Sequence, residues 1–236
     1  MKRLLSTVAA AIAMSLIFGT TAIAHDVKLG LFTDGSGAEI GWARGPDSPL
    51  DTSAREVGLN IRTDPGEYAY AYKPGFGLGA PGGTSVAGTN VRNLSFDFLN
   101  TLGGGYVGAG APRFSVAIIE ASGPDADTDD FAFLSAFYCQ LPTSDPNWSR
   151  ADFTGATDSQ GECALQFEGV TYSNSATQSA WQVFVAANPG VRVDYAYVIV
   201  DEPTQPIRVR LDRIAMQNHM QLSGGKTVHC PNEGSC

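Results

Sequence analysis

The segment VRVDYAYVIV, residues 191–200, decides the fold that the sequence predicts. Its odd positions are apolar or aromatic, and its even positions change from polar in the first half to apolar in the second. A period of two residues is typical of a β-strand, and an apolar second half on both faces is typical of a strand inside a sheet. We therefore expect a central strand here.

A second strand is expected at residues 206–216, where apolar and charged residues alternate from Ile207 onward. Ile214 breaks the alternation, which predicts a β-bulge near Asp212 and Arg213. Only the short link at 201–206 separates this strand from the one before it. We therefore expect the two strands to form a closing hairpin, with the basic face of the second strand toward solvent.

Eight further segments are rich in β-branched or aromatic residues, and glycine (27 residues) and proline (13) interrupt the chain too often for long helices. These further strands are expected at residues 27–32, 56–62, 67–73, 91–99, 113–120, 131–139, 164–167 and 181–187. Short strands with loops between them predict an all-β fold, an antiparallel two-sheet β-sandwich in a single domain.

The first 24 residues have the pattern of a secretory signal peptide. Lys2 and Arg3 form a basic start, an apolar region follows, and Ala22-Ile23-Ala24 is a small-residue cleavage site. Cleavage leaves a β-sandwich domain at 25–222 and a polar tail at 223–236. The apolar region is shorter than the ~20 residues that span a membrane. We expect a secreted protein, extracellular or periplasmic, without a membrane span.

Four cysteines in an exported chain predict two disulfides, for which three pairings are possible. We favour local pairing, Cys139 with Cys163 and Cys230 with Cys236. The first bond would tie a loop to its flanking strands, and the second would close the end of the tail.

The charge of the chain argues against nucleic acid as a partner. Loss of the signal peptide takes the formal net charge from −9 to −11, and the sequence has no basic stripe that could follow a phosphate backbone. An acidic balance suits an extracellular protein or one that holds a cation.

Alternate aspartates at Asp125, Asp127 and Asp129 offer hard oxygen ligands of the kind that calcium prefers. The run differs from an EF-hand, because a predicted strand replaces the exiting helix. It is interpreted either as another kind of calcium loop or as a solvated acidic turn. No cofactor is required by the sequence, and calcium is possible.

Aromatic residues are the candidate ligand contacts. Tyr68, Tyr70 and Tyr72 alternate and so project from one face of a strand, while Trp42 and Tyr106 lie in or near loops and strand edges. Exposed aromatic rings stack on sugar rings. The alternative is that the tyrosine side of the strand is the core, since alternate aromatics usually mark a buried face.

Motifs for catalysis are weak. The chain contains no GxSxG nucleophile elbow, and no spacing singles out the two facing carboxylates that glycoside hydrolysis needs. The sequence therefore favours binding over catalysis.

Three segments carry a family resemblance: LSFDF at 94–98, the strand at 193–200, and VRLDRI at 209–214. Together they resemble the galactose-binding-like jelly roll of extracellular carbohydrate-binding modules. The resemblance implies a jelly-roll β-sandwich and a structural calcium at Asp212. The segment at 104–114 is similar to a stretch of secreted bacterial proteins of this type.

A second resemblance rests on His25, the first residue after cleavage. Its α-amine and imidazole resemble the histidine brace of secreted lytic polysaccharide mono-oxygenases, which implies a copper site completed by His219 or His229.

The leading hypothesis is a secreted non-catalytic module that binds an extracellular glycan or cell-surface component. The alternatives are a copper mono-oxygenase that uses His25 and an extracellular structural protein without a small ligand. The oligomeric state stays open.

Overall fold

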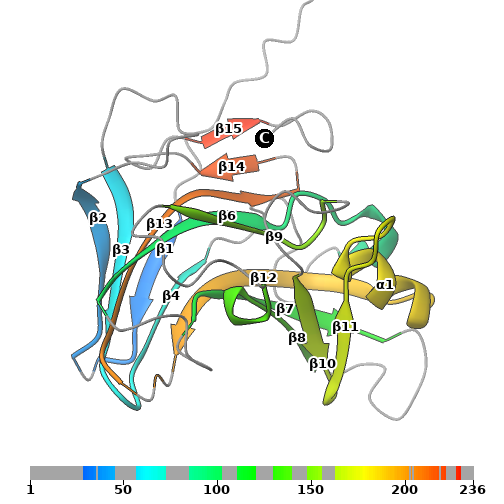
Figure 1. Ribbon diagram of the computed structural model, residues 1–236, viewed down its shortest axis with the longest axis horizontal. Helices are drawn as coiled ribbons and strands as arrows, with labels where there is room; N and C mark the ends of the chain where they lie inside the picture. Colours follow the sequence, from blue (N-terminus) through cyan, green and yellow to red (C-terminus); the bar gives the residue numbers. More distant parts are fainter. Residues whose placement is uncertain are drawn as a thin grey trace, which may run out of the picture.

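The computed structural model describes residues 29–35, 37–45, 57–72, 85–102, 111–120, 130–139, 148–155, 163–201, 203, 205–217, 219–221 and 227–229. These residues form two antiparallel sheets packed face to face, with one α-helix at an end of the sandwich (Figure 1). The prediction of an all-β sandwich in a single domain is confirmed, and the arrangement is compatible with a jelly roll.

The eight-stranded sheet has the order β1-β4-β12-β7-β8-β10-β11, and β5 pairs with β12 beside this path. Its strands are β1 (Gly30–Thr33), β4 (Tyr68–Tyr72), β5 (Val86–Ala87), β7 (Arg113–Ile119), β8 (Asp130–Ser135), β10 (Ala164–Phe167), β11 (Val170–Ser173) and β12 (Arg192–Asp201). β12 lies inside the sheet, as its apolar second half predicts.

The seven-stranded sheet has the order β15-β14-β13-β3-β2, and β6 pairs with both β13 and β9. Its strands are β2 (Glu39–Arg44), β3 (Val57–Thr63), β6 (Ser95–Leu102), β9 (Ser149–Asp152), β13 (Ile207–Met216), β14 (His219–Gln221) and β15 (Thr227–His229). β15 shows that the stretch expected as a polar tail adds a strand to the sheet edge. Two short 3₁₀ helices are η1 (Gly88–Asn90) and η3 (Ala136–Tyr138).

The space between the sheets is filled by a core rich in phenylalanine. Phe96 of β6 meets Phe114 of β7 across the core, with ring centroids 5.3 Å apart, and Phe153 contacts both rings. On the eight-stranded sheet, Ala69 and Ala71 face this core and are fully buried. Buried aromatic area of this kind dominates the stability of such a core.

Residues 181–187 form an α-helix, α1 (Ala180–Ala187), so the strand predicted there is wrong. A capping box opens the helix: Ser179 Oγ accepts a hydrogen bond from the Gln182 amide (3.2 Å), and Gln182 Oε1 accepts one from the Ser179 amide (2.9 Å). Trp181 and Phe184, three positions apart, are both buried, and the Phe184 ring packs on rings from β10 and β11.

The expected hairpin of the last two long strands is also wrong, because β12 and β13 belong to different sheets. The link between them carries the chain from one sheet to the other. The basic face is not wholly exposed either: Arg210 is buried and donates a hydrogen bond to Asn60 Oδ1 at 3.1 Å. A Cβ at Gly58 would lie 2.7 Å from Arg210 Nε, so glycine makes room for this side chain.

The β-bulge predicted near Asp212 and Arg213 is confirmed. The register between β13 and β6 shifts between Asp212 and Ala215, and Arg213 has a φ of 46°. A disulfide joins Cys139 to Cys163, as the local pairing predicts. Cys230 and Cys236 lie outside the described residues, as do the expected signal peptide and its predicted cleavage site.

Within the described part of the chain, no helix has the length and apolar character needed to cross a membrane.

Candidate functional site

The three alternating tyrosines of β4 lie on the outer face of the eight-stranded sheet. Tyr68 is 40% exposed and Tyr70 and Tyr72 are half-buried, whereas Ala69 and Ala71 between them are fully buried. The interpretation that the tyrosine side forms the core is therefore wrong.

β12 adds two more tyrosines to the same face. Its register pairs Ile199 with Tyr70 and Asp201 with Tyr68, so the odd positions of β12 share the outer side. A register shift between Val193 and Ala196 reverses this alternation, so the odd positions before the shift lie on the other side of the sheet. We call the side chains of Tyr68, Tyr70, Tyr72, Tyr195 and Tyr197 the tyrosine face.

The rings of the tyrosine face contact one another. Tyr68 and Tyr70 stack along β4 with centroids 6.4 Å apart, and Tyr195 and Tyr197 stack along β12 at 6.3 Å. Tyr70 and Tyr197 meet between the strands at 5.4 Å. Phe32 of β1 and Phe131 of β8 extend the aromatic surface on both sides. The mutual packing holds the rings in place before any ligand arrives.

The sheet around these rings is arched. In Figure 1, β1 and β4 at one end and β8, β10 and β11 at the other turn away from the seven-stranded sheet, which makes the outer face concave. A pocket of about 470 Å³ lies on this face. It is lined by Tyr68, Tyr70, Tyr72, Tyr195, Tyr197, Ile199 and Asp201.

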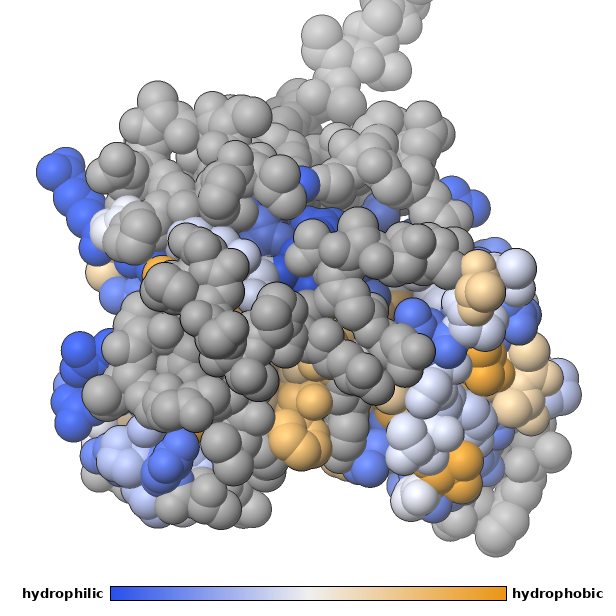
Figure 2. Space-filling model, in the orientation of Figure 1, coloured by the Kyte–Doolittle hydropathy of each residue, from blue (hydrophilic) through white to orange (hydrophobic). Residues whose placement is uncertain are grey.

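Exposed apolar side chains gather on the same sheet. Among the described residues, Phe32, Tyr68 and Phe133 are exposed and lie on the outer face of this sheet, since Phe32 is paired with Tyr70, and Phe133 and Tyr197 are both paired with Ser115. Figure 2 shows apolar residues at the surface over the lower layer, and hydrophilic residues at the margin near β2. Phe32 and Phe133 continue the apolar surface of the tyrosine face beyond the pocket, as expected of an interaction site.

An ion pair borders the pocket. Arg113 of β7 donates from both Nη atoms to the two carboxylate oxygens of Asp201, each at 2.6 Å. The guanidinium carbon also lies 4.7 Å from the ring centre of Phe133. A bidentate pair with an aromatic contact fixes both side chains at the edge of the pocket.

Two phenol groups of the face are held in the neutral form. Burial raises the pKa of Tyr197 above its ordinary value, with smaller opposing effects from Ser115 and Arg113. Burial also raises the pKa of Tyr72, and the negative charge of Asp194 acts in the same direction. The buried hydroxyl of Tyr72 has no hydrogen-bond partner among the described residues. A neutral phenol without a partner can donate a hydrogen bond to a ligand.

Of the other two predicted ligand contacts, Trp42 is not brought to this face. Trp42 lies in β2 of the seven-stranded sheet, where it packs against the core and borders a different pocket. Tyr106 lies outside the described residues, as do Asp125, Asp127, Asp129 and His25.

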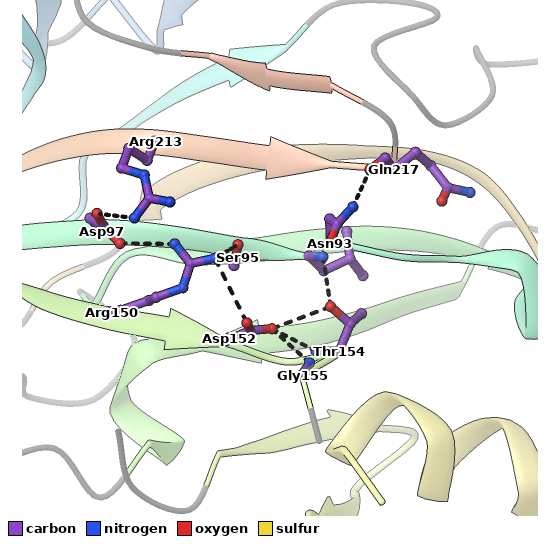
Figure 3. A network of polar contacts seen from close by, with 10 residues as sticks. Asn93, Ser95, Asp97, Arg150, Asp152, Thr154, Gly155, Arg213 and Gln217 are labelled. Atoms are coloured by element: carbon purple, nitrogen blue, oxygen red, sulfur yellow. Dashed lines mark hydrogen bonds and ion pairs between the residues drawn. The ribbon is translucent and has the colours of Figure 1, made fainter. Parts of the chain in front are cut away.

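Asp212, the implied calcium ligand, lies in β13 and is almost fully buried. Its Oδ1 accepts a hydrogen bond from the Arg213 amide at 2.8 Å, and its cross-strand partner is Asp97. Asp97 in turn contacts Arg150 at 3.2 Å and Arg213 at 3.4 Å (Figure 3). Among the described residues, no group of three or more potential metal ligands occurs. Calcium therefore stays a prediction for the aspartate run.

The two candidate copper partners are neighbours in the backbone. His219 of β14 is paired directly with His229 of β15. The copper hypothesis itself depends on His25 and stays a prediction.

A second pocket of about 470 Å³ lies beside α1, lined in part by Arg92, Trp181 and Val185. The indole N–H of Trp181 in this pocket already has a partner, because Nε1 donates a hydrogen bond to the Gly88 carbonyl at 2.9 Å. We therefore regard the tyrosine face as the better candidate.

Comparison with known proteins returns no matching family model and no significant match among curated proteins.

Sequence reasoning named three of the five tyrosines and missed Tyr195, Tyr197, Arg113 and Asp201 as site residues. The alternation of residues 191–200 contains the signal for the two tyrosines, since it places them on one side of a strand. The ion pair joins residues 88 positions apart, which no local pattern reveals.

Proposed function

We propose that this protein is a secreted, non-catalytic binding module that recognises an extracellular glycan at the tyrosine face. The observation that carries the proposal is the arrangement of side chains in β4, where the small alanines face the core and the large tyrosines line an open pocket. A fold that needed only stability would bury these rings, since apolar burial is its main driving force.

The chemistry of the pocket suits a sugar. Aromatic rings pack against the apolar faces of sugar rings, and phenol hydroxyls exchange hydrogen bonds with sugar hydroxyls. The pocket of about 470 Å³ is within the range of ligand sites, roughly 300–1,000 Å³. The unpartnered Tyr72 hydroxyl is a group that a ligand hydroxyl would satisfy.

The described lining of the pocket favours binding over hydrolysis. Glycoside hydrolysis uses two facing carboxyl groups, whereas Asp201 is the single carboxylate among the described residues that line the pocket. That carboxylate is held by Arg113. The signal peptide and the Cys139–Cys163 disulfide support export to an oxidising compartment.

The test is affinity electrophoresis of the mature protein in gels that contain soluble polysaccharides, followed by calorimetry on those that retard it. We expect retardation by at least one glycan, and about tenfold weaker binding in Tyr70→Ala and in Tyr197→Ala, because each loses a packed ring. Phe137→Ala is the matched control, because it removes an exposed aromatic ring that does not line the pocket.

Two results would overturn the proposal. One is a folded protein that no polysaccharide in the panel retards. The other is binding that Tyr70→Ala and Phe137→Ala weaken equally. If sedimentation also showed a dimer that Tyr70→Ala dissociates, the face would be a contact between copies of the chain.

A further inference from the structure

The tyrosine face has a defined charge character. Among the described residues that line the pocket, Asp201 is the only one charged at neutral pH. Its partner Arg113 has both Nη atoms directed to the Asp201 carboxylate and its guanidinium carbon against the Phe133 ring. The Arg113 guanidinium is therefore already committed to a carboxylate inside the protein.

A second carboxylate lies beside the tyrosine face. Asp194 of β12 lies close enough to Tyr72 to act on its phenol, and it is 5% exposed. The whole chain carries a formal net charge of −9. A field of this sign repels carboxylate, sulfate and phosphate groups that approach the site.

The remaining polar groups of the pocket are phenol hydroxyls, which both donate and accept hydrogen bonds. Such groups match the hydroxyls of an uncharged sugar. They offer an anionic sugar no counter-charge for the solvation that it loses on binding.

We infer that the tyrosine face selects uncharged glycans and excludes glycans that bear uronate, sulfate or phosphate groups, and that the Arg113–Asp201 pair is the selecting element. This inference rests on the proposed function. With Asp201 in place, the pair is electrically neutral and the Arg113 guanidinium is not available to an anionic sugar. Without it, Arg113 becomes a cation able to hold a carboxylate.

The experiment uses charge-matched pairs of probes that share a backbone: hydroxyethyl cellulose against carboxymethyl cellulose, and methyl-esterified pectin against polygalacturonate. In about 10 mM salt, where the Debye length is about 30 Å, we expect the wild-type protein to bind the neutral member of a pair about tenfold more tightly. In about 1 M salt, where the Debye length is about 3 Å, the ratio should shrink.

Asp201→Asn should lower the ratio of neutral to anionic binding by about tenfold, because it leaves the positive charge of Arg113 uncompensated at the pocket edge. Glu168→Gln is the matched control: it removes one negative charge at the exposed turn between β10 and β11 and should leave the ratio unchanged. The salt series on the wild-type protein tests the same inference without any variant.

The outcomes separate the two proposals. If the neutral and anionic polysaccharides both retarded the protein equally and Tyr70→Ala abolished both effects, the charge selection would be overturned. The proposed glycan site would still be supported. An equal loss of the ratio in Asp201→Asn and Glu168→Gln would overturn the role of the ion pair. If no probe bound, the proposed function and the inference would fall together.

Discussion

At the scale of single residues, the arrangement within β4 runs against hydropathy. Ala69 and Ala71 are fully buried while the larger Tyr68 is 40% exposed. Four phenylalanines, Phe96, Phe98, Phe114 and Phe153, occupy the core that these alanines face. Small side chains therefore suffice on the inner side of β4, and the rings on its outer side remain available for contact.

The titration of the tyrosine face is the first prediction. Burial raises the pKa of Tyr197 and Tyr72 above the ordinary 10.0, so the unfolded chain loses these phenol protons first. The free energy of unfolding should therefore fall as the pH rises above 10, and the contribution is fully present below that pH. Ultraviolet absorbance of tyrosinate should show late-titrating phenols that Tyr197→Phe reduces in number. Titration of every tyrosine at its ordinary pKa would contradict this.

The second prediction concerns Asp97, which is 1% exposed between two arginines. Asp97→Ala leaves Arg150 and Arg213 without this carboxylate and should lower the free energy of unfolding by about 3–5 kcal/mol, measured in urea. Glu39→Ala removes an exposed carboxylate that lies 3.6 Å from Arg62 and should change little. Equal losses in the two variants would show that the buried contacts of Asp97 stabilise the fold no more than the exposed Glu39–Arg62 contact does.

At the scale of elements, alternation predicted strands well and could not identify the helix. Residues 181–187 contain a β-branched and aromatic run that suits either structure. What decides for a helix is the capping box between Ser179 and Gln182 together with the burial of Trp181 and Phe184 against β10 and β11. The capping box is a local signal that the sequence contains, whereas the burial of the two rings depends on tertiary packing.

The capping box supplies the third prediction. Ser179→Ala removes the acceptor for the Gln182 amide and should lower the free energy of unfolding by about 1 kcal/mol. Thr177→Ala, an exposed position before the helix, is the control and should have little effect. Equal urea midpoints for Ser179→Ala and the wild type would contradict the role of the cap.

The link between β12 and β13 shows a second limit of local patterns. The short connection is typical of a hairpin, but this link, which contains Pro203 and Pro206, carries the chain from one sheet to the other. Alternation tells which side chains share a face of a strand, and it does not tell which strands are neighbours. The β-bulge at Asp212 and Arg213 was predictable because it breaks alternation inside one strand.

At the scale of the whole molecule, the two-sheet fold and three of the seven site residues followed from the sequence. The three tyrosines of β4 were identified from their spacing, whereas the neighbouring tyrosines of β12 and the Arg113–Asp201 pair come from strands far apart in the chain. Strand order brings them together, and strand order is a property of the complete sandwich.

The fourth prediction concerns the disulfide that ties η3, after β8, to the start of β10. Cys139 and Cys163 are 24 positions apart, so the bond closes a loop of moderate length. Cys139→Ala/Cys163→Ala should lower the free energy of unfolding by about 3 kcal/mol. Reductant should then have no further effect at this site. Unchanged stability in the double variant would show that the bond does not constrain the unfolded chain.

The most direct test of the central claim is nuclear magnetic resonance of protein labelled with carbon-13 in the rings of its eight tyrosines, titrated with a polysaccharide fragment that it binds. Binding at the tyrosine face predicts that the ring signals of Tyr70 and Tyr197 shift with the fragment, while that of Tyr172, packed against Phe184 beside α1, does not. Saturable binding that shifts Tyr172 and leaves Tyr70 and Tyr197 unchanged would contradict it.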